Sequence, residues 1–353
     1  MKSDVVLFGT GRLARCVVYN LATTTLSRKP VTVLVVGRSR IDVEEIAFVA
    51  RGRAGAVGEH HVFESLTASW ADASVAEEIL RQHRPVVTMV AASEQSPWEL
   101  ARDGDAWADL VKRGGYGVTL PLNASLVSQV FRAANATEPP PFFINACYPD
   151  AVNSVLAALG PCDRLVGVGN VAIIESLYRG AFPETKTFRI VAHHRHLGEL
   201  SNGDERDPPL AYADGNPASL TTVASALRGI RGAELNWVTG AAVSRLIGAL
   251  VADRPFSGSV PGPLGEIGGY PVTVERGAIT LDLPDGVSMS DARDLNTRAA
   301  LREGVVVREG RAQFSAGARE ALMESDYPFA DGFTASSLHD AVSEMRALRE
   351  RVR

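Results

Sequence analysis

Short apolar runs alternate with longer amphipathic segments through the first half of the chain. The apolar runs predict buried strands over residues 5–8, 31–36, 85–90 and 142–147. Helical spacing of the apolar positions predicts helices over residues 42–50, 74–83, 122–134 and 150–159. Strands that alternate with helices favour parallel pairing and right-handed crossovers, so we expect an α/β fold with a doubly wound parallel sheet.

The pattern changes near residue 160, where we expect a second domain to begin. Antiparallel strands are predicted over residues 188–192, 270–275 and 278–283, the last two joined as a hairpin across Arg276-Gly277. Residues 201–217 are rich in Gly, Asp, Asn and Pro and are predicted to form a mobile loop. Residues 1–160 should therefore form one domain, and residues 161–353 an α+β domain with a helical extension.

The extension ends in an amphipathic segment over residues 337–353. Ser337 with Asp340 resembles a capping box at its start. One helical face carries Leu338, Ala341, Val342, Met345 and Leu348. Such a face needs an apolar partner, either in this subunit or in a second one.

Composition narrows the function classes. The chain has 353 residues, 46% of them hydrophobic and 22% charged, which is typical of a globular protein. A net charge of −5 argues against nucleic acid or a membrane surface as a partner. The apolar runs are far shorter than the roughly 20 residues that span a bilayer, and residues 1–4 lead straight into a strand, so we expect a cytoplasmic location.

Three cysteines are present, and none of them has a CxxC partner or a histidine at metal-ligand spacing. Neither a disulfide framework nor a metal site is therefore expected. They are Cys16, Cys147 and Cys162.

The first strand runs into a glycine motif, Gly9-Thr10-Gly11-Arg12-Leu13-Ala14, and then into a helical pattern. Glycines without a Cβ let a pyrophosphate approach the turn, and amide groups at the helix start then face the phosphates. Strand, glycine turn and helix in this order predict a dinucleotide-binding site, whereas the competing interpretation is an ordinary strand-to-helix turn.

The end of the second strand discriminates between the two nicotinamide cofactors. A site that prefers NAD usually carries an acid there, which repels a 2′-phosphate. This chain instead has Arg38, Ser39 and Arg40. We therefore predict NADPH in preference to NADH, the alternative being that the arginines are solvated loop residues. Ala91 and Ala92 follow the strand that ends at residue 90 and are also expected beside the cofactor.

The second half resembles the C-terminal half of lactate and malate dehydrogenases. The resemblance rests on residues 236–250 and the hairpin over residues 269–284, with Tyr148-Pro149-Asp150 similar to that family's Asn-Pro-Val-Asp turn. It covers residues 5 to about 300. It implies a Rossmann-type NAD(P)-binding domain, a dehydrogenase-like C-terminal domain and a homodimer or higher homo-oligomer. Asn145 would position the nicotinamide.

The same resemblance implies a catalytic pair. Residues 190–194 are similar to the family strand that leads to the catalytic histidine, which places His194 as the proton donor, with His193 and His196 as register alternatives. Residues 169–176 are similar to the segment that carries the orienting aspartate, which places Glu175 there. Imidazole suits the role because its ordinary pKa lies near operating pH.

Departures from the family suggest an unusual substrate. The family's carboxylate-binding arginine corresponds to Tyr178, with Arg179 next to it. The loop that carries further arginines in the family contains none here, but has Glu94 and Trp98. Without a bidentate arginine a bound carboxylate loses several charge-assisted hydrogen bonds. We therefore expect Tyr178 or Arg179, Glu94 and Trp98 to contact the substrate, although Glu94 can equally be a solvated loop acid.

The sequence thus predicts an NADPH-dependent oxidoreductase that reduces a carbonyl or imine of a small substrate other than a simple 2-oxo acid. One alternative is an opine-type or imine reductase that acts on an amino compound. The other is a catalytically quiet nucleotide-binding protein, which the missing arginines favour.

Overall fold

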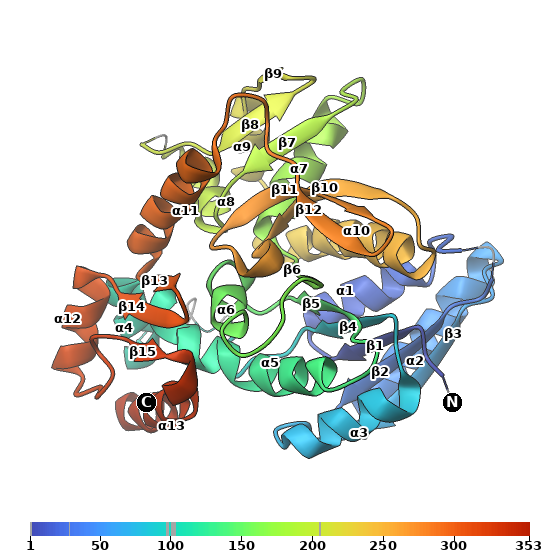
Figure 1. Cartoon of the computed structure of the whole chain (residues 1–353), viewed down its shortest axis with the longest axis horizontal. Helices are drawn as coiled ribbons and strands as arrows, with labels where there is room; N and C mark the ends of the chain where they lie inside the picture. Colours follow the sequence, from blue (N-terminus) through green and yellow to red (C-terminus); the bar gives the residue numbers. More distant parts are fainter. Residues whose placement is uncertain (1, 28, 97–98, 100–103, 205) are drawn as a thin grey trace.

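The computed structural model describes residues 2–27, 29–96, 99, 104–204 and 206–353. Its first half is built on a six-stranded parallel sheet in the order β3-β2-β1-β4-β5-β6 (Figure 1). The strands are β1 (Val5–Phe8), β2 (Thr32–Gly37), β3 (Val62–Thr67), β4 (Val87–Val90), β5 (Phe142–Asn145) and β6 (Leu165–Gly167). A doubly wound parallel sheet was predicted from the alternating pattern, and the strand order reverses between β1 and β4.

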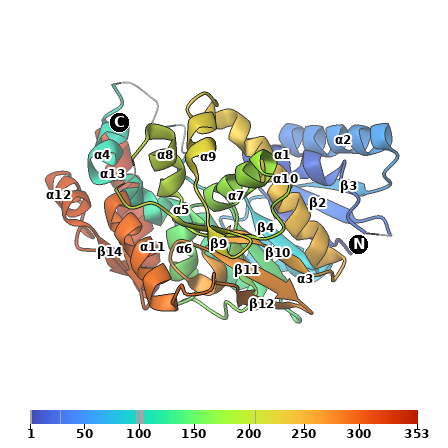
Figure 2. The same cartoon turned by 90° about the horizontal axis from the view of Figure 1, so that it is seen from above.

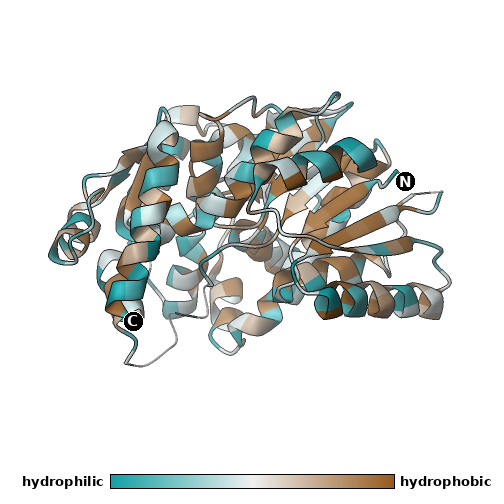
Figure 3. Cartoon of the chain, turned by 90° about the horizontal axis from the view of Figure 1, so that it is seen from below, coloured by the Kyte–Doolittle hydropathy of each residue, from teal (hydrophilic) through white to brown (hydrophobic). Residues whose placement is uncertain are grey.

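The central strands of the sheet are buried on both faces, whereas the edge strand β3 is partly exposed. Successive strand residues point to opposite sides, so Val5 and Leu7 enter one core while Val6 and Phe8 enter another. This explains why the central strands are apolar without alternation, and they stand out as hydrophobic segments between amphipathic helices in Figure 3. The helices of this half are α1 (Arg12–Leu21), α2 (Arg40–Val57), α3 (Ala73–His83), α4 (Ala106–Gly114), α5 (Leu120–Asn135) and α6 (Pro149–Leu156).

The second half adds three small antiparallel sheets and further helices. The sheets are β7-β8-β9 (Phe188–Val191, Leu210–Ala213, Asn216–Pro217), β10-β11-β12 (Phe256–Pro261, Gly269–Glu275, Ala278–Leu281) and β13-β14-β15 (Val305–Arg308, Arg311–Phe314, Phe333–Thr334). The helices are α7 (Asn170–Ala181), α8 (Arg195–Asn202), α9 (Thr221–Leu227), α10 (Gly232–Val251), α11 (Met289–Glu303), α12 (Ala316–Glu324) and α13 (Leu338–Val352).

Two of the hydrophobic cores contain residues from both sides of residue 160, the expected domain boundary. Helix α10 packs along α1, and Figure 2 shows the two side by side. Gly240 permits this approach, because a Cβ there would lie 2.7 Å from the Cys16 carbonyl oxygen. Residues 305–348 contribute to the same core as α4 and α5. The expected extension of the second domain therefore packs on the first half of the chain.

Two local expectations were wrong. Residues 201–217 were predicted to form a loop, but β8 and β9 form a hairpin within them. Ser337 does not cap α13 with its side chain. Instead, Thr334 forms a capping box with Ser337 at the preceding short helix, so the cap lies three residues earlier than predicted.

The apolar face of α13 is covered within this chain. Its five predicted residues are at most 4% exposed and join the core that contains α5. The helix therefore needs no second subunit to bury that face, and the homo-oligomer stays a prediction. Among the described residues, no helix combines the length and the apolar character needed to cross a membrane.

We predict that Met345→Ala lowers the free energy of unfolding by about 2–5 kcal/mol, because a fully buried side chain leaves a cavity. Met323→Ala is the matched control, since Met323 is 53% exposed and should change stability by less than about 0.5 kcal/mol. Urea denaturation measures both variants. Equal losses would mean that α13 is not part of the core.

Candidate functional site

The glycine motif lies at the switch point of the sheet. Gly9 has φ +134°, and a Cβ there would lie 2.6 Å from the Ala91 carbonyl oxygen, so only glycine fits between the ends of β1 and β4. Gly11 precedes α1, faces open space and caps the helix without a side-chain hydrogen bond. The first amide groups of α1 are thus left for a ligand, and this cradle fits the pyrophosphate of a dinucleotide.

The end of β2 presents an exposed cluster of polar side chains. Ser39 caps α2 by accepting a hydrogen bond from the Asp42 amide at 3.3 Å. Arg40 is bound to Glu44 at 2.7 Å, whereas Arg38 is exposed and has no ion pair with any described residue. Of Arg38 and Arg40, Arg38 is therefore the residue whose guanidinium is available to bind a phosphate.

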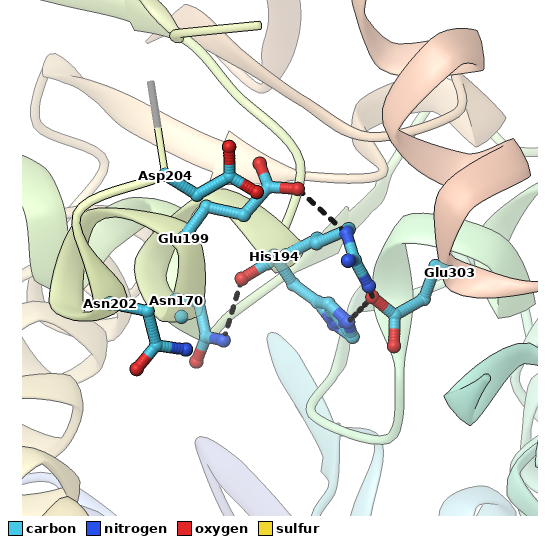
Figure 4. A pocket seen from close by; sticks show the side chains of 8 residues that line it. Asn170, His194, Glu199, Asn202, Asp204 and Glu303 are labelled. Atoms are coloured by element: carbon cyan, nitrogen blue, oxygen red, sulfur yellow. Dashed lines mark hydrogen bonds and ion pairs between the residues drawn. The ribbon is translucent and has the colours of Figure 1, made fainter. Parts of the chain in front are cut away.

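Two adjoining cavities, of about 450 and 310 Å³, share Asn170, His194 and Glu303. The larger one is also lined by Leu13 of the glycine-motif helix, so it reaches from the dinucleotide cradle to His194. Figure 4 shows the smaller one, with His194 and Glu303 joined by a dashed line. No lysine or arginine among the described residues lines the larger cavity.

The backbone of His194 is held on both sides. Its N–H donates to Asp150 Oδ1 at 2.8 Å, and its carbonyl accepts from Asn170 Nδ2 at 3.0 Å. The ring nitrogen Nε2 lies 3.4 Å from Glu303 Oε2, and the side chain is 18% exposed. The imidazole is thus oriented by a carboxylate and open to the cavity, which are the conditions for a general acid.

An aromatic wall packs against the imidazole. The ring centroid of Tyr148 lies 5.0 Å from that of His194, and the ring of Tyr116 lies 5.1 Å from that of Tyr148. Tyr148 has φ +47°, which is unfavourable for a bulky residue and concentrates at functional sites. Pro149 then starts α6 at a position where its missing N–H costs nothing.

His193 and His196 are buried and form hydrogen bonds within the protein. His193 is fully buried, and its Nδ1 accepts from the Arg195 amide at 3.3 Å. The Nδ1 of His196 accepts from the His193 amide at 2.8 Å, and its Nε2 donates to the Asp207 carbonyl at 3.0 Å. Burial lowers the pKa of both rings, that of His196 to about 4. Of the three register alternatives, His194 is the one that lines the cavities.

Solved structures of dehydrogenases resemble this chain. Malate dehydrogenase from Picrophilus torridus is 14% identical, with a TM-score of 0.58 over 92% of this chain and 100% of that one. Malate dehydrogenase from Archaeoglobus fulgidus in complex with NADH is 14% identical, with a TM-score of 0.55 over 92% and 99%. Lactate dehydrogenase from Eimeria maxima with NADH and oxamate is 13% identical, with a TM-score of 0.50 over 85% and 91%.

The chain has the fold of malate and lactate dehydrogenases. The resemblance inferred from the sequence is thereby confirmed for the fold. No protein-family model matches the sequence, and no curated protein matches it either.

The catalytic pair that this dehydrogenase fold implied is not formed as expected. Glu175 accepts from the Ser259 amide at 2.5 Å and from Arg179 Nε at 2.8 Å, and it lines a different, small cavity. Asn170 and Ile173 of the same helix face His194, and five residues of helix rotate Glu175 about 140° away from Asn170. Glu303 of α11 takes the place beside the imidazole.

Tyr178 and Arg179 do not reach the cavities at His194. Tyr178 stacks on Phe188 with ring centroids 4.1 Å apart and is 7% exposed. Arg179 is held by Glu175 and points toward the Phe188 carbonyl at 3.5 Å. Both residues support the packing of α7 on β7, and the expectation that they bind the substrate is corrected accordingly.

Glu94 is engaged by the C-terminal helix rather than by a ligand. Arg346 Nε donates to its carboxylate at 2.6 Å, and Ser125 also donates to it. Arg349 donates to the Glu94 carbonyl at 2.6 Å. Glu94 is therefore a structural anchor and not a substrate contact. Trp98, the other predicted contact in this loop, lies outside the described residues.

Asn145 is enclosed within the turn after β5. Its Nδ2 donates to the Cys147 carbonyl at 3.2 Å and to Asn153 Oδ1 at 2.8 Å, while its Oδ1 accepts from the Cys147 amide at 2.7 Å. Both amide hydrogens are used, and the residue is fully buried. Asn145 shapes the turn, and Ala146 lines the larger cavity in its place.

Three potential metal-ligand atoms, one each from His193, His194 and Glu303, lie within 4.8 Å of one another. The guanidinium of Arg195 lies 3.3 Å from Glu303 Oε2, so a positive charge already faces this carboxylate. The grouping is better explained as a charged hydrogen-bond network than as a metal site.

Sequence reasoning missed Glu303, Asn170 and Tyr116. Glu303 precedes Gly304, so locally it looks like an ordinary helix end. Asp150 and Tyr148 were noticed only as parts of a turn. The left-handed conformation at Tyr148 has no signature in an aromatic residue, so only the Tyr-Pro-Asp order pointed there.

We predict that stability falls as pH is lowered from 6.5 toward 4, in part because buried His196 must become protonated. Its folded pKa lies below its ordinary value, so its contribution is present above pH 6.5 and is lost as pH falls to about 4. The loss is on the order of 3 kcal/mol. His196→Gln should flatten the pH dependence of the urea midpoint, and exposed His339→Gln should not. Identical pH profiles in all three proteins would contradict this.

Proposed function

We propose that this protein is a nicotinamide-dinucleotide-dependent oxidoreductase that reduces a carbonyl or imine of a small substrate, with NADPH as the preferred cofactor. One observation carries the proposal: a single cavity is walled by Leu13 at the dinucleotide cradle and by His194 with its carboxylate partner. Such a cavity joins a cofactor site to a proton donor, which is what carbonyl reduction needs.

The cofactor class is supported by the fold and by the cradle. The Archaeoglobus fulgidus and Eimeria maxima structures contain NADH. The preference for NADPH rests on this chain alone, because Arg38 is exposed beside the end of β2 and lacks an ion-pair partner among the described residues. Asp42, the nearest acid in sequence, is bound to Arg15 at 2.9 Å.

The chemistry divides between the cofactor and the chain. Reduced nicotinamide would supply the hydride to the substrate carbon. His194 would hold a proton at a ring nitrogen and deliver it to the substrate oxygen or nitrogen, while Glu303 fixes the ring and compensates its charge. Asp150 and Asn170 hold the His194 backbone, so the ring keeps its direction through the transfer.

A simple 2-oxo acid does not suit this cavity. Its carboxylate would require a cationic clamp, and no lysine or arginine lines the larger cavity among the described residues. Arg195, which lines the smaller one, is already bound to Glu199 at 2.7 Å and faces Glu303.

We predict that Arg38→Ala weakens NADPH binding at least tenfold and leaves NADH binding within twofold, because one charge-assisted hydrogen bond contributes about 1.5–3 kcal/mol. Equilibrium fluorescence titration measures both affinities. Arg81→Ala is the control, since Arg81 is exposed on α3 and paired with Glu78. Wild-type protein that binds NADH as tightly as NADPH would refute the preference.

We predict that His194→Asn lowers turnover by about 10²–10⁴-fold, the usual contribution of a general acid, with NADPH affinity unchanged. NADPH oxidation is followed with 2-oxo acids, amino-aldehydes and cyclic imines as test substrates. His339→Asn serves as the control, because His339 is exposed on α13. Unchanged turnover in His194→Asn would remove His194 from the mechanism, and NADPH binding without turnover on any substrate would favour a quiet nucleotide-binding protein.

A further inference from the structure

Asp150 is an acid near His194 that has no ion pair with a lysine or arginine among the described residues, and the positive charge that acts on it is that of the His194 imidazole. The neighbouring acids each have such an ion pair: Glu303 faces Arg195, Glu199 binds Arg302, Asp207 binds Arg298 and Asp204 binds Arg206. Asp150 is 1% exposed, and its Oδ1 accepts a hydrogen bond from the backbone N–H of His194. Its second oxygen, Oδ2, is buried and has no hydrogen-bond partner among the described residues.

A second unpartnered group belongs to the same cavity. Tyr148 is 5% exposed, and its hydroxyl is buried without a hydrogen-bond partner among the described residues. Tyr148 and Asp150 both line the 450 Å³ cavity, together with Tyr116. A buried carboxylate without a counter-charge is costly, and buried polar atoms in native structures usually find partners. Burial accordingly raises the pKa of Asp150.

The surroundings suit a positive charge. Aromatic faces attract cations, and the cavity offers the rings of Tyr116 and Tyr148, whose centroids lie 5.1 Å apart. Asp150 Oδ2 and the Tyr148 hydroxyl are both enclosed, so a ligand reaches them only when these side chains move toward the cavity. Both atoms can accept a hydrogen bond, so the ligand should carry N–H groups rather than a fully alkylated nitrogen. A carboxylate in the same place would face Asp150 and Glu303 and be repelled.

We propose that Asp150, Tyr148 and Tyr116 form a subsite for a protonated amine or iminium group on the substrate. The inference rests on the proposed function, because it places this cation in the cavity that leads to His194. It identifies the substrate class as amino-carbonyl compounds or cyclic iminium ions. Asp150 is then a specificity-determining residue as well as the anchor of the His194 backbone.

The test measures binding by calorimetry at neutral pH, with and without NADPH. The probes share one ring size: pyrrolidine, which is protonated, cyclopentanol, which is neutral, N,N-dimethylpyrrolidinium, which is cationic without N–H, and cyclopentanecarboxylate, which is anionic. We expect pyrrolidine to bind at least tenfold more tightly than the other three. Equal binding of the four probes, no binding, or a preference for the carboxylate would overturn the subsite.

Asp150→Asn removes the charge and keeps an oxygen that can accept the His194 N–H bond, so the fold should persist. It should reduce the preference for pyrrolidine over cyclopentanol to less than threefold. Tyr148→Phe should reduce only the preference for pyrrolidine over N,N-dimethylpyrrolidinium. Asp294→Asn, which makes the same change at a separate cavity of about 720 Å³, should leave both preferences intact. A retained pyrrolidine preference in Asp150→Asn would overturn the assignment.

The two proposals fail in distinguishable ways. If NADPH does not bind but wild-type protein still prefers pyrrolidine, the proposed function is wrong and the subsite stands. If NADPH binds and the preference is absent, the subsite is wrong and the dinucleotide site stands. If Asp150→Asn lowers turnover equally for cationic and neutral substrates, Asp150 acts through His194 alone and the subsite is rejected.

Discussion

A hydrogen bond from the His194 backbone N–H to Asp150 links the two halves of the chain where the chemistry is proposed to occur. Asp150 lies in the first turn of α6, and the turn before it is held by the buried side chain of Asn145. The position of the imidazole is therefore set by the sheet through β5, and not by the surface around the cavity. Asn170 holds the opposite side of the same peptide segment, so these two hydrogen bonds fix the backbone from which the ring projects, and Glu303 then orients the ring.

The C-terminal helix belongs to the nucleotide-binding half as much as to its own segment. Its apolar face completes the core that contains α5, and its polar side fixes the segment after β4 through Arg346 and Arg349 at Glu94. That segment begins with Ala91, which packs against Gly9 of the dinucleotide cradle. The last helix thus supports one wall of the switch point from outside. Because the Glu94 carboxylate is only 18% exposed, removing Arg346 alone would leave a largely buried charge without its partner.

The sequence sufficed for four strands of the parallel sheet, because strands buried on both faces are apolar at every position, as in Val5–Phe8. It did not predict β3, which is partly exposed and carries polar residues, or the three-residue β6. It also sufficed for the glycine turn, since only glycine fits beside Ala91. It could not assign the carboxylate at His194, because Glu303 lies 109 residues along the chain and no local pattern distinguishes it from other helix ends. The mistaken assignments at Glu175, Tyr178 and Glu94 share this cause: each residue has a plausible local position and a partner that only the tertiary structure reveals.

The contrast between the preserved backbone and the relocated side chains has a physical basis. At 13–14% identity the fold persists, because the path of the backbone is fixed by burial and close packing, which tolerate few alternatives. A carboxylate beside an imidazole has no such constraint, since any neighbouring element can supply it. In this chain α11 supplies it, and the helix position that the resemblance assigned to that acid is used to bind Arg179 and the Ser259 amide instead. The fold therefore limits the positions that a proton donor can occupy. The surrounding charges determine which substrate binds beside it, and similarity of fold does not determine those charges.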